Sequence, residues 1–138
     1  MASYSSENPK FRVGEAVQIR VPFLTTAAAQ DKNILTMKCM SHPFIITSAV
    51  INFTALDTFS KGVDIDVEVD NGTTETTLAY YDTVGGASAT AVDTIYSMSA
   101  GAVAPRCPVG SWLQLHIDDD EDAACEGVVY LEGYYEAG

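Results

Sequence analysis

The sequence has few basic side chains and no long apolar run. It contains 7 lysines and arginines against 19 aspartates and glutamates, which gives a formal net charge of −12. Proteins that bind nucleic acid present a basic face to the phosphates, so this balance argues against a nucleic-acid partner. No run of about 18 apolar residues occurs, and the sequence therefore predicts no membrane-spanning helix.

The sequence predicts no signal peptide and shows no cysteine motif. Its amino-terminal residues contain no basic region followed by an apolar stretch. Cys39, Cys107 and Cys125 show no CxxC spacing. In a chain made and kept in a reducing cytosol, three free and mostly buried thiols are the simplest interpretation. One disulfide with a leftover thiol is the alternative.

Acidic residues are abundant, and they are concentrated in the second half of the chain. Residues 1–56 contain five basic and three acidic side chains, whereas residues 57–138 contain two basic and sixteen acidic ones. The two halves therefore carry formal charges of +2 and −14. A solubilising surface explains this asymmetry most simply. The alternative is a basic amino-terminal segment that docks on a partner while an acidic body faces solvent.

The length of 138 residues suits one domain. Residues 1–14 are polar and aperiodic, which predicts an extended amino-terminal arm ahead of a single domain at residues 15–138. Apolar side chains alternate over residues 15–24, as in a half-buried strand, and Pro22 places that strand at a sheet edge or at its own end. Further strands are predicted over residues 34–40, 44–55, 112–118 and 126–136.

Two connecting segments are less regular. Residues 25–33 are predicted to form a loop or a single helical turn. Residues 84–104 leave two alternatives, a short helix or a strand between long loops. Many short strands without alternating helices predict an all-β fold, a jelly-roll or Greek-key β-sandwich.

The clearest single element is a hairpin. Residues 63–70 alternate strictly between apolar and acidic, and Asn71-Gly72 follows them. Asn-Gly between alternating strands predicts a two-residue type I′ turn, which pairs residues whose numbers sum to 143. Glu68 would then lie directly opposite Glu75. Like charges in that position are destabilising, so compensation is expected from bulk water and salt. The alternative is a lysine or arginine of a neighbouring subunit, or a cation.

The sequence offers little that could carry catalysis or hold a metal. The acidic run at residues 118–122 departs from a calcium-binding EF-hand loop at Ala123 and Val129, where a glycine and a glutamate are needed. A solvated tip is therefore predicted, with a weak surface calcium site as the alternative. Cys39 and His42 are the only closely spaced pair of metal-ligand types, which is too few for a zinc site. No nucleophile elbow or phosphate-binding glycine loop occurs, so no enzyme, metal or cofactor is predicted.

Two surface features remain. Lys10, Phe11 and Arg12 form the only basic cluster with an aromatic, which is either an ordinary edge strand or an anchor whose phenyl ring fills a partner's pocket. Tyr130 and Tyr134 near the carboxyl terminus belong either to the sandwich core or to a subunit interface.

The chain resembles the small head-decoration, or cement, proteins of tailed bacteriophages. The resemblance lies in the polar arm leading into residues 15–24, the Gly/Ala/Ser/Thr-rich stretch at 85–104, and the late Val-Gly-Ser-Trp-Leu-Gln-Leu-His strand at 109–116. It implies a non-enzymatic structural protein of the virion, made in the host cytoplasm. Such proteins sit on the outer surface of the major-capsid lattice, commonly as homotrimers, and bridge neighbouring capsomers.

On this basis two sets of residues are expected to make contacts. Docking on the major capsid protein is expected at Lys10, Phe11, Arg12 and Arg20. Subunit contacts are expected at Glu68, Glu75, Tyr130 and Tyr134. The alternative function is a carbohydrate-binding β-sandwich module of a phage tail or fibre, with Trp112 and exposed tyrosines as stacking platforms for sugar rings.

Overall fold

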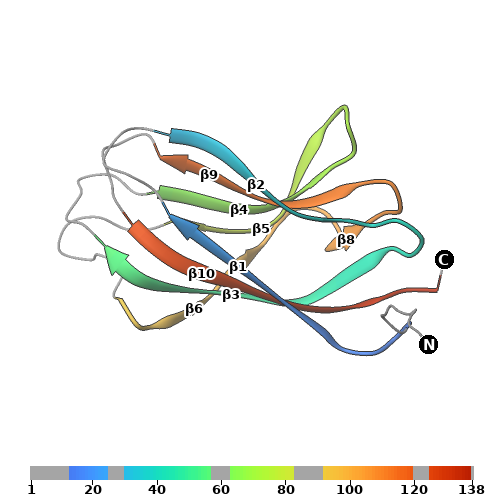
Figure 1. The fold of residues 1–138 in the computed structure, drawn as a ribbon, viewed down its shortest axis with the longest axis horizontal. Coiled ribbons are helices and arrows are strands. Elements are labelled where there is room, and N and C mark those ends of the chain that lie inside the picture. The colour runs from blue at the N-terminus through green and yellow to red at the C-terminus, as the bar shows by residue number, and fades with distance from the viewer. Residues whose placement is uncertain (1–12, 25–29, 57–62, 83–91, 120–124, 138) are drawn as a thin grey trace, which may run out of the picture.

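The computed structural model describes residues 13–24, 30–56, 63–82, 92–119 and 125–137. Ten strands in this part of the chain form two antiparallel sheets that pack face to face (Figure 1). The first sheet has the order β1-β10-β3-β6, with β8 also paired to β3, and the second has the order β2-β9-β4-β5-β7. The prediction of an all-β sandwich is confirmed.

The first sheet consists of β1 (Val17–Leu24), β10 (Cys125–Tyr135), β3 (Phe44–Leu56), β6 (Ile95–Ser97) and β8 (Arg106–Cys107). The second sheet consists of β2 (Gln30–Lys38), β9 (Trp112–Asp119), β4 (Val63–Asp70), β5 (Glu75–Asp82) and β7 (Ser99–Ala100).

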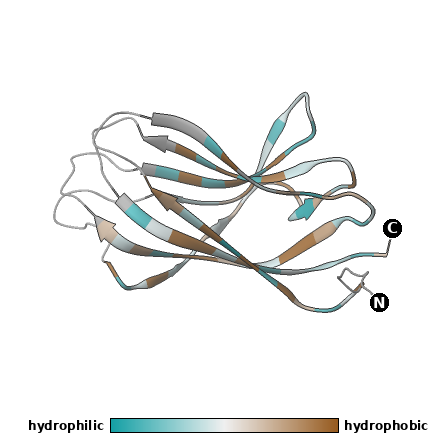
Figure 2. Cartoon of the chain, in the orientation of Figure 1, coloured by the Kyte–Doolittle hydropathy of each residue, from teal (hydrophilic) through white to brown (hydrophobic). Residues whose placement is uncertain are grey.

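The core lies between the sheets and is made by alternate residues of each strand. Apolar and polar segments alternate along the strands (Figure 2), because successive side chains of a strand point to opposite faces. Leu113, Leu115 and Ile117 of β9 are buried, as the alternation predicts. The rings of Phe23 and Phe53 meet edge to face across the first sheet, with 5.7 Å between their centroids.

Two segments differ from the sequence-based predictions. A loop or helical turn is predicted over residues 25–33, but β2 begins at Gln30, where it pairs with Asp119 of β9. The sequence there is polar, so the strand is imposed by its ladder with β9 and not by local propensity. In the segment at 84–104, β6 and β7 form short strands, and the described residues 92–104 contain no helix. The other residues of these two segments, 25–29 and 84–91, lie outside the described part.

The β4–β5 hairpin has a four-residue turn, so the predicted two-residue turn is wrong. Asp70 pairs with Glu75, and the Asn71 side-chain oxygen accepts hydrogen bonds from the backbone N–H groups of Thr73 (2.9 Å) and Thr74 (2.8 Å). This side-chain cap closes a longer turn than the Asn-Gly pair alone would. Glu68 consequently lies opposite Thr77 and not opposite Glu75. Further from the turn, a bulge between Val67 and Glu68 shifts the register of the ladder again.

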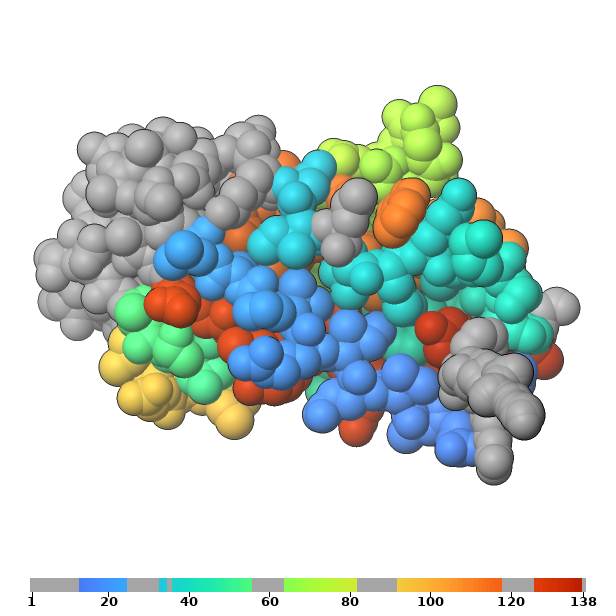
Figure 3. All heavy atoms as spheres, viewed as in Figure 1, coloured from blue at the N-terminus to red at the C-terminus, as the bar shows by residue number. Residues whose placement is uncertain are grey.

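The described chain starts beside the end of β10. Gly14 donates its backbone N–H to the carbonyl oxygen of Tyr135 (2.8 Å). Residues 1–12 of the expected arm lie outside the described part. Pro22 lies in the edge strand β1, as predicted. In the space-filling view, β1 (blue) and β2 (cyan) lie next to each other on the side of the molecule that faces the viewer, where the edges of the two sheets meet (Figure 3).

Candidate functional site

The outer face of the second sheet carries cross-strand rows of polar side chains. Ile65, Val67 and Val69 of β4 point into the core, so the acidic residues between them lie on the outer face. The ladders align Glu68 with Gln114 of β9. The next row places Asp66 of β4 beside Tyr80 of β5 and His116 of β9.

Gln114 joins the two glutamates that the sequence analysis singled out. Its Nε2 donates to Glu68 Oε1 (3.2 Å) and to Glu75 Oε2 (3.1 Å). A side-chain amide has two N–H groups, so each carboxylate receives one. Gln114 is only 1% exposed and Glu68 only 7% exposed, although both lie on the outer face. A neutral amide from the neighbouring strand therefore compensates the two like charges, a source that the sequence analysis did not consider.

The contacts continue to the sheet edge. Asn33 of β2 donates from Nδ2 to Glu75 Oε2 (3.4 Å), and its Oδ1 lies 2.5 Å from His116 Nδ1. Because Asn33 presents an oxygen to the ring, His116 Nδ1 is the donor of that bond. We call Glu68, Glu75, Gln114, Asn33 and His116 the carboxylate network. It connects side chains of β5, β4, β9 and β2 through hydrogen bonds.

Two aromatic side chains flank the carboxylate network. Trp112 is 37% exposed and Tyr80 39% exposed. Trp112 pairs with Asp70 of β4 on one side and with Lys38 of β2 on the other. Because the next residue, Leu113, is buried in the core, Trp112 lies on the outer face. Flat rings beside amide and carboxylate groups form a surface that can stack on a ligand and hydrogen-bond to it.

The carboxylate network shows no arrangement that would hold a metal. No group of three or more histidine, cysteine, aspartate or glutamate side chains is placed to bind an ion, among the residues that the structure describes. The acidic run at 118–122 lies largely outside that part, since residues 120–124 are not described.

The outer face of the first sheet differs in chemical character. The apolar residues on this face are Pro22 and Leu24 of β1, Val128 of β10, Val50 of β3 and Ile95 of β6, since their neighbours along each strand point into the core. Asn52 lies between Val128 and Ile95 on the same face, and the exposed Glu126 lies opposite Leu24. Ile95 is 67% exposed. We call the five apolar residues the apolar face.

The apolar face is bordered by residues that the sequence analysis named. Arg20 is exposed and lies directly opposite the half-buried Tyr130. Tyr134 is half-buried near the end of β10. The structure thus separates the expected subunit contacts, with Glu68 and Glu75 on one outer face of the sandwich and Tyr130 on the other. Lys10, Phe11 and Arg12 lie outside the described residues.

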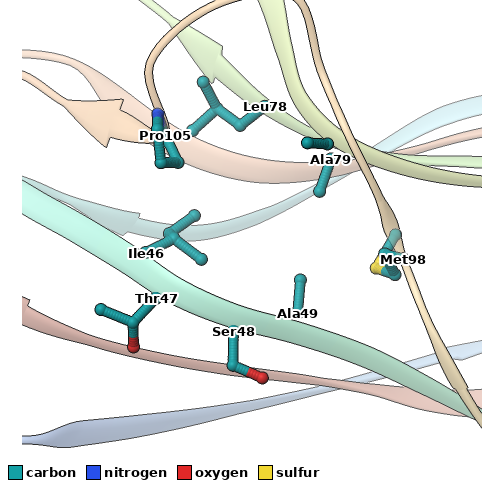
Figure 4. A pocket seen from close by; sticks show the side chains of 9 residues that line it. Ile46, Thr47, Ser48, Ala49, Leu78, Ala79, Met98 and Pro105 are labelled. Carbon is teal, nitrogen blue, oxygen red and sulfur yellow. The ribbon is translucent and has the colours of Figure 1, made fainter.

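A small cavity opens between the two sheets (Figure 4). Ile46 and Ala49 of β3 point towards Leu78 and Ala79 of β5, and Met98 stands at the side. Its volume is about 190 Å³, and none of its lining residues is titratable. The cavity is lined mainly by apolar side chains and can accept an apolar group, and its polar side chains are the hydroxyl-bearing Thr47 and Ser48.

Sequence reasoning identified Trp112, Glu68 and Glu75 but missed Gln114 and Tyr80. Gln114 follows the alternation of β9 like any solvent-facing polar residue, so its sequence position carries no special signal. Only the pairing of β9 with β4 reveals its role.

Comparison with known proteins gives no neighbour. No protein-family description, curated protein or solved structure matches this chain. No helix that could cross a membrane occurs in the described part of the chain.

Proposed function

We propose that this chain is a non-enzymatic virion structural protein that decorates the outer surface of a major-capsid lattice. The observation that carries the proposal is the contrast between the two outer faces of the sandwich. The outer face of the first sheet carries the apolar face, with Arg20 and Glu126 at its border, whereas the outer face of the second sheet carries the carboxylate network. Two faces of different character give the protein a defined orientation on a surface.

The strand connections support the same class of protein. The chain crosses from the first sheet to the second between β1 and β2 and again between β3 and β4. It crosses from the second sheet to the first between β9 and β10. β1 and β3 flank β10 in one sheet, while β2 and β4 flank β9 in the other. This nested order leads us to infer a jelly roll, an architecture used by viral capsid domains.

In the proposed complex, the apolar face and the amino-terminal arm contact the capsid, and the carboxylate network faces outward. Arg20 and the expected arm residues Lys10 and Arg12 meet carboxylates of the capsid protein, and Phe11 fills a pocket there. Each contact is weak, and the many equivalent sites of a lattice multiply their effect. A homotrimer would bridge neighbouring capsomers.

The test measures binding to purified heads that lack the protein. Wild-type protein should co-sediment with the heads, and its occupancy should fall as salt rises, because charge contacts are screened. Arg20→Glu and deletion of residues 1–12 should each weaken binding by about tenfold or more. Light scattering of the isolated protein tests the trimer.

Lys38→Glu is the matched control. Lys38 is exposed on the opposite outer face, opposite Trp112, so its reversal should leave binding unchanged. Occupancy that does not respond to salt, to Arg20→Glu or to removal of the arm would contradict the proposal. A monomer in light scattering would contradict the bridging by trimers.

A carbohydrate-binding module is the second candidate function, and the exposure of Trp112 and Tyr80 beside the carboxylate network favours it. Rings of this kind stack on sugars, while amide and carboxylate oxygens accept hydrogen bonds from hydroxyl groups. Glycan-array binding that is lost in Trp112→Ala and Tyr80→Ala would support this candidate. If the protein binds none of the glycans, this candidate is excluded and capsid decoration stays the favoured function.

A further inference from the structure

Two cysteines from different sheets meet inside the sandwich. Cys39 directly follows β2 of the second sheet, and Cys107 ends β8 of the first. Both side chains are buried and in the free thiol form. The two thiols lie close enough for each to shift the pKa of the other.

Backbone contacts fix this meeting. The carbonyl oxygen of Ser111 accepts the N–H of Cys39 (3.0 Å) and lies 3.6 Å from the Sγ of Cys107. The carbonyl oxygen of Cys39 in turn accepts the N–H of Gly110 (2.7 Å). The turn at residues 108–111 therefore holds both cysteines against one another.

A hydrogen bond from Cys107 to the ionised Cys39 makes the two thiols unequal. It lowers the pKa of Cys39, against the opposing effect of burial, because Cys107 donates to the developing thiolate. The same bond and burial raise the pKa of Cys107. Cys39 is thus the thiol that ionises more readily, while Cys107 retains its proton.

We propose that Cys39 and Cys107 are a redox-active pair that closes into an intramolecular disulfide when the protein meets a peroxide. The Cys39 thiolate attacks one oxygen of hydrogen peroxide, the O–O bond breaks, and Cys39 becomes a sulfenic acid. The leaving hydroxide takes up the proton that Cys39 released on ionising, and departs as water. The sulfur of Cys107 then attacks the Cys39 sulfur. The S–S bond forms, the S–O bond breaks, and a second water carries away the hydroxyl group and the thiol proton.

The burial of the pair selects a small oxidant. Hydrogen peroxide is close to water in size, whereas oxidised glutathione is too bulky for two thiols that are almost fully covered. The bond would tie the end of β2 to β8 and so link the two sheets covalently. A protein made in a reducing cytosol would gain this link only after its release.

The experiment treats the reduced full-length protein with hydrogen peroxide, then denatures it, alkylates free thiols and measures the intact mass. The expected result is a loss of about 2 Da before alkylation, with a single thiol left to alkylate. Peptide mapping should join the Cys39 and Cys107 peptides. The thermal midpoint should rise by roughly 10 °C, because the cross-link closes a long loop of the unfolded chain.

Cys125→Ser is the matched control and should form the same bond, whereas Cys39→Ser and Cys107→Ser should not. Because the main measurement uses the wild-type chain, the conclusion does not depend on how well those two variants fold. Three results would overturn the proposal: a link that includes Cys125, oxidation of Cys39 to a sulfinic acid without a link, or both thiols still open to alkylation after treatment.

Discussion

Replacing Gln114 by methionine isolates the contribution of the carboxylate network. Methionine has a similar volume and no N–H groups, so Glu68 loses its bond while the packing changes little. A hydrogen bond to a buried charge contributes about 1.5–3 kcal/mol. The bond to Glu75 contributes little, because that side chain is exposed and water replaces the amide.

One effect opposes this loss. The Oε1 of Gln114 is buried without a hydrogen-bond partner among the described residues. Its removal recovers part of the cost of about 1–3 kcal/mol that an unsatisfied buried group carries. The net expectation is a loss of about 1 kcal/mol in the free energy of unfolding. For a domain of this size, that corresponds to a fall in Tm of roughly 4 °C.

Urea unfolding at neutral pH, followed by circular dichroism, measures the change. Gln18→Met is the control, since it makes the same substitution on an exposed position of β1 and should alter stability by less than about 0.5 kcal/mol. The double variant Glu68→Leu, Gln114→Met removes both partners and should be more stable than the sum of the single losses predicts. Additive losses, or a Gln114→Met variant as stable as the wild type, would refute the reasoning.

Three further perturbations give separate expectations. Gly133→Ala should destabilise the protein by about 3 kcal/mol or prevent folding, because the new Cβ would lie 2.0 Å from a backbone oxygen of β3. The yield of soluble protein and the free energy of unfolding in urea measure this effect. Stability should fall as pH rises above about 9, because folding raises the pKa of Cys107 from 9.0 and of Tyr135 from 10.0, and the unfolded chain therefore releases these protons first. Urea titrations from about pH 8 to about pH 10.5 measure that slope, which should be shallower in Cys107→Ser. Asp70→Asn should stabilise the hairpin by about 0.5 kcal/mol at low salt and by less at high salt, since Asp70 opposes Glu75.

The parts of the fold that depend on local periodicity were predictable from the sequence. Alternation in β4 and β9 gives both the strands and their buried faces, because a period of two is a property of the strand itself. Pro22 likewise indicates an edge by its own chemistry.

The parts that depend on distant partners were not predictable. β2 begins within a polar stretch because β9 supplies its ladder, and no local signal announces that. The turn after Asp70 depends on which backbone groups the Asn71 side chain caps. The carboxylate network needs the registers of four strands together, so Gln114 gains its role only in the folded chain.

The position of Pro22 in the edge strand β1 also bears on how copies of the protein can associate. An open edge with regular N–H and C=O groups invites another chain to add a strand, which leads to fibres and aggregates. Pro22 has no N–H to offer, so it interrupts that template within β1. Pro22 therefore disfavours assembly by backbone pairing along this edge, which accepts almost any sequence, and favours assembly through the broad faces of the sheets, where side chains select the partner.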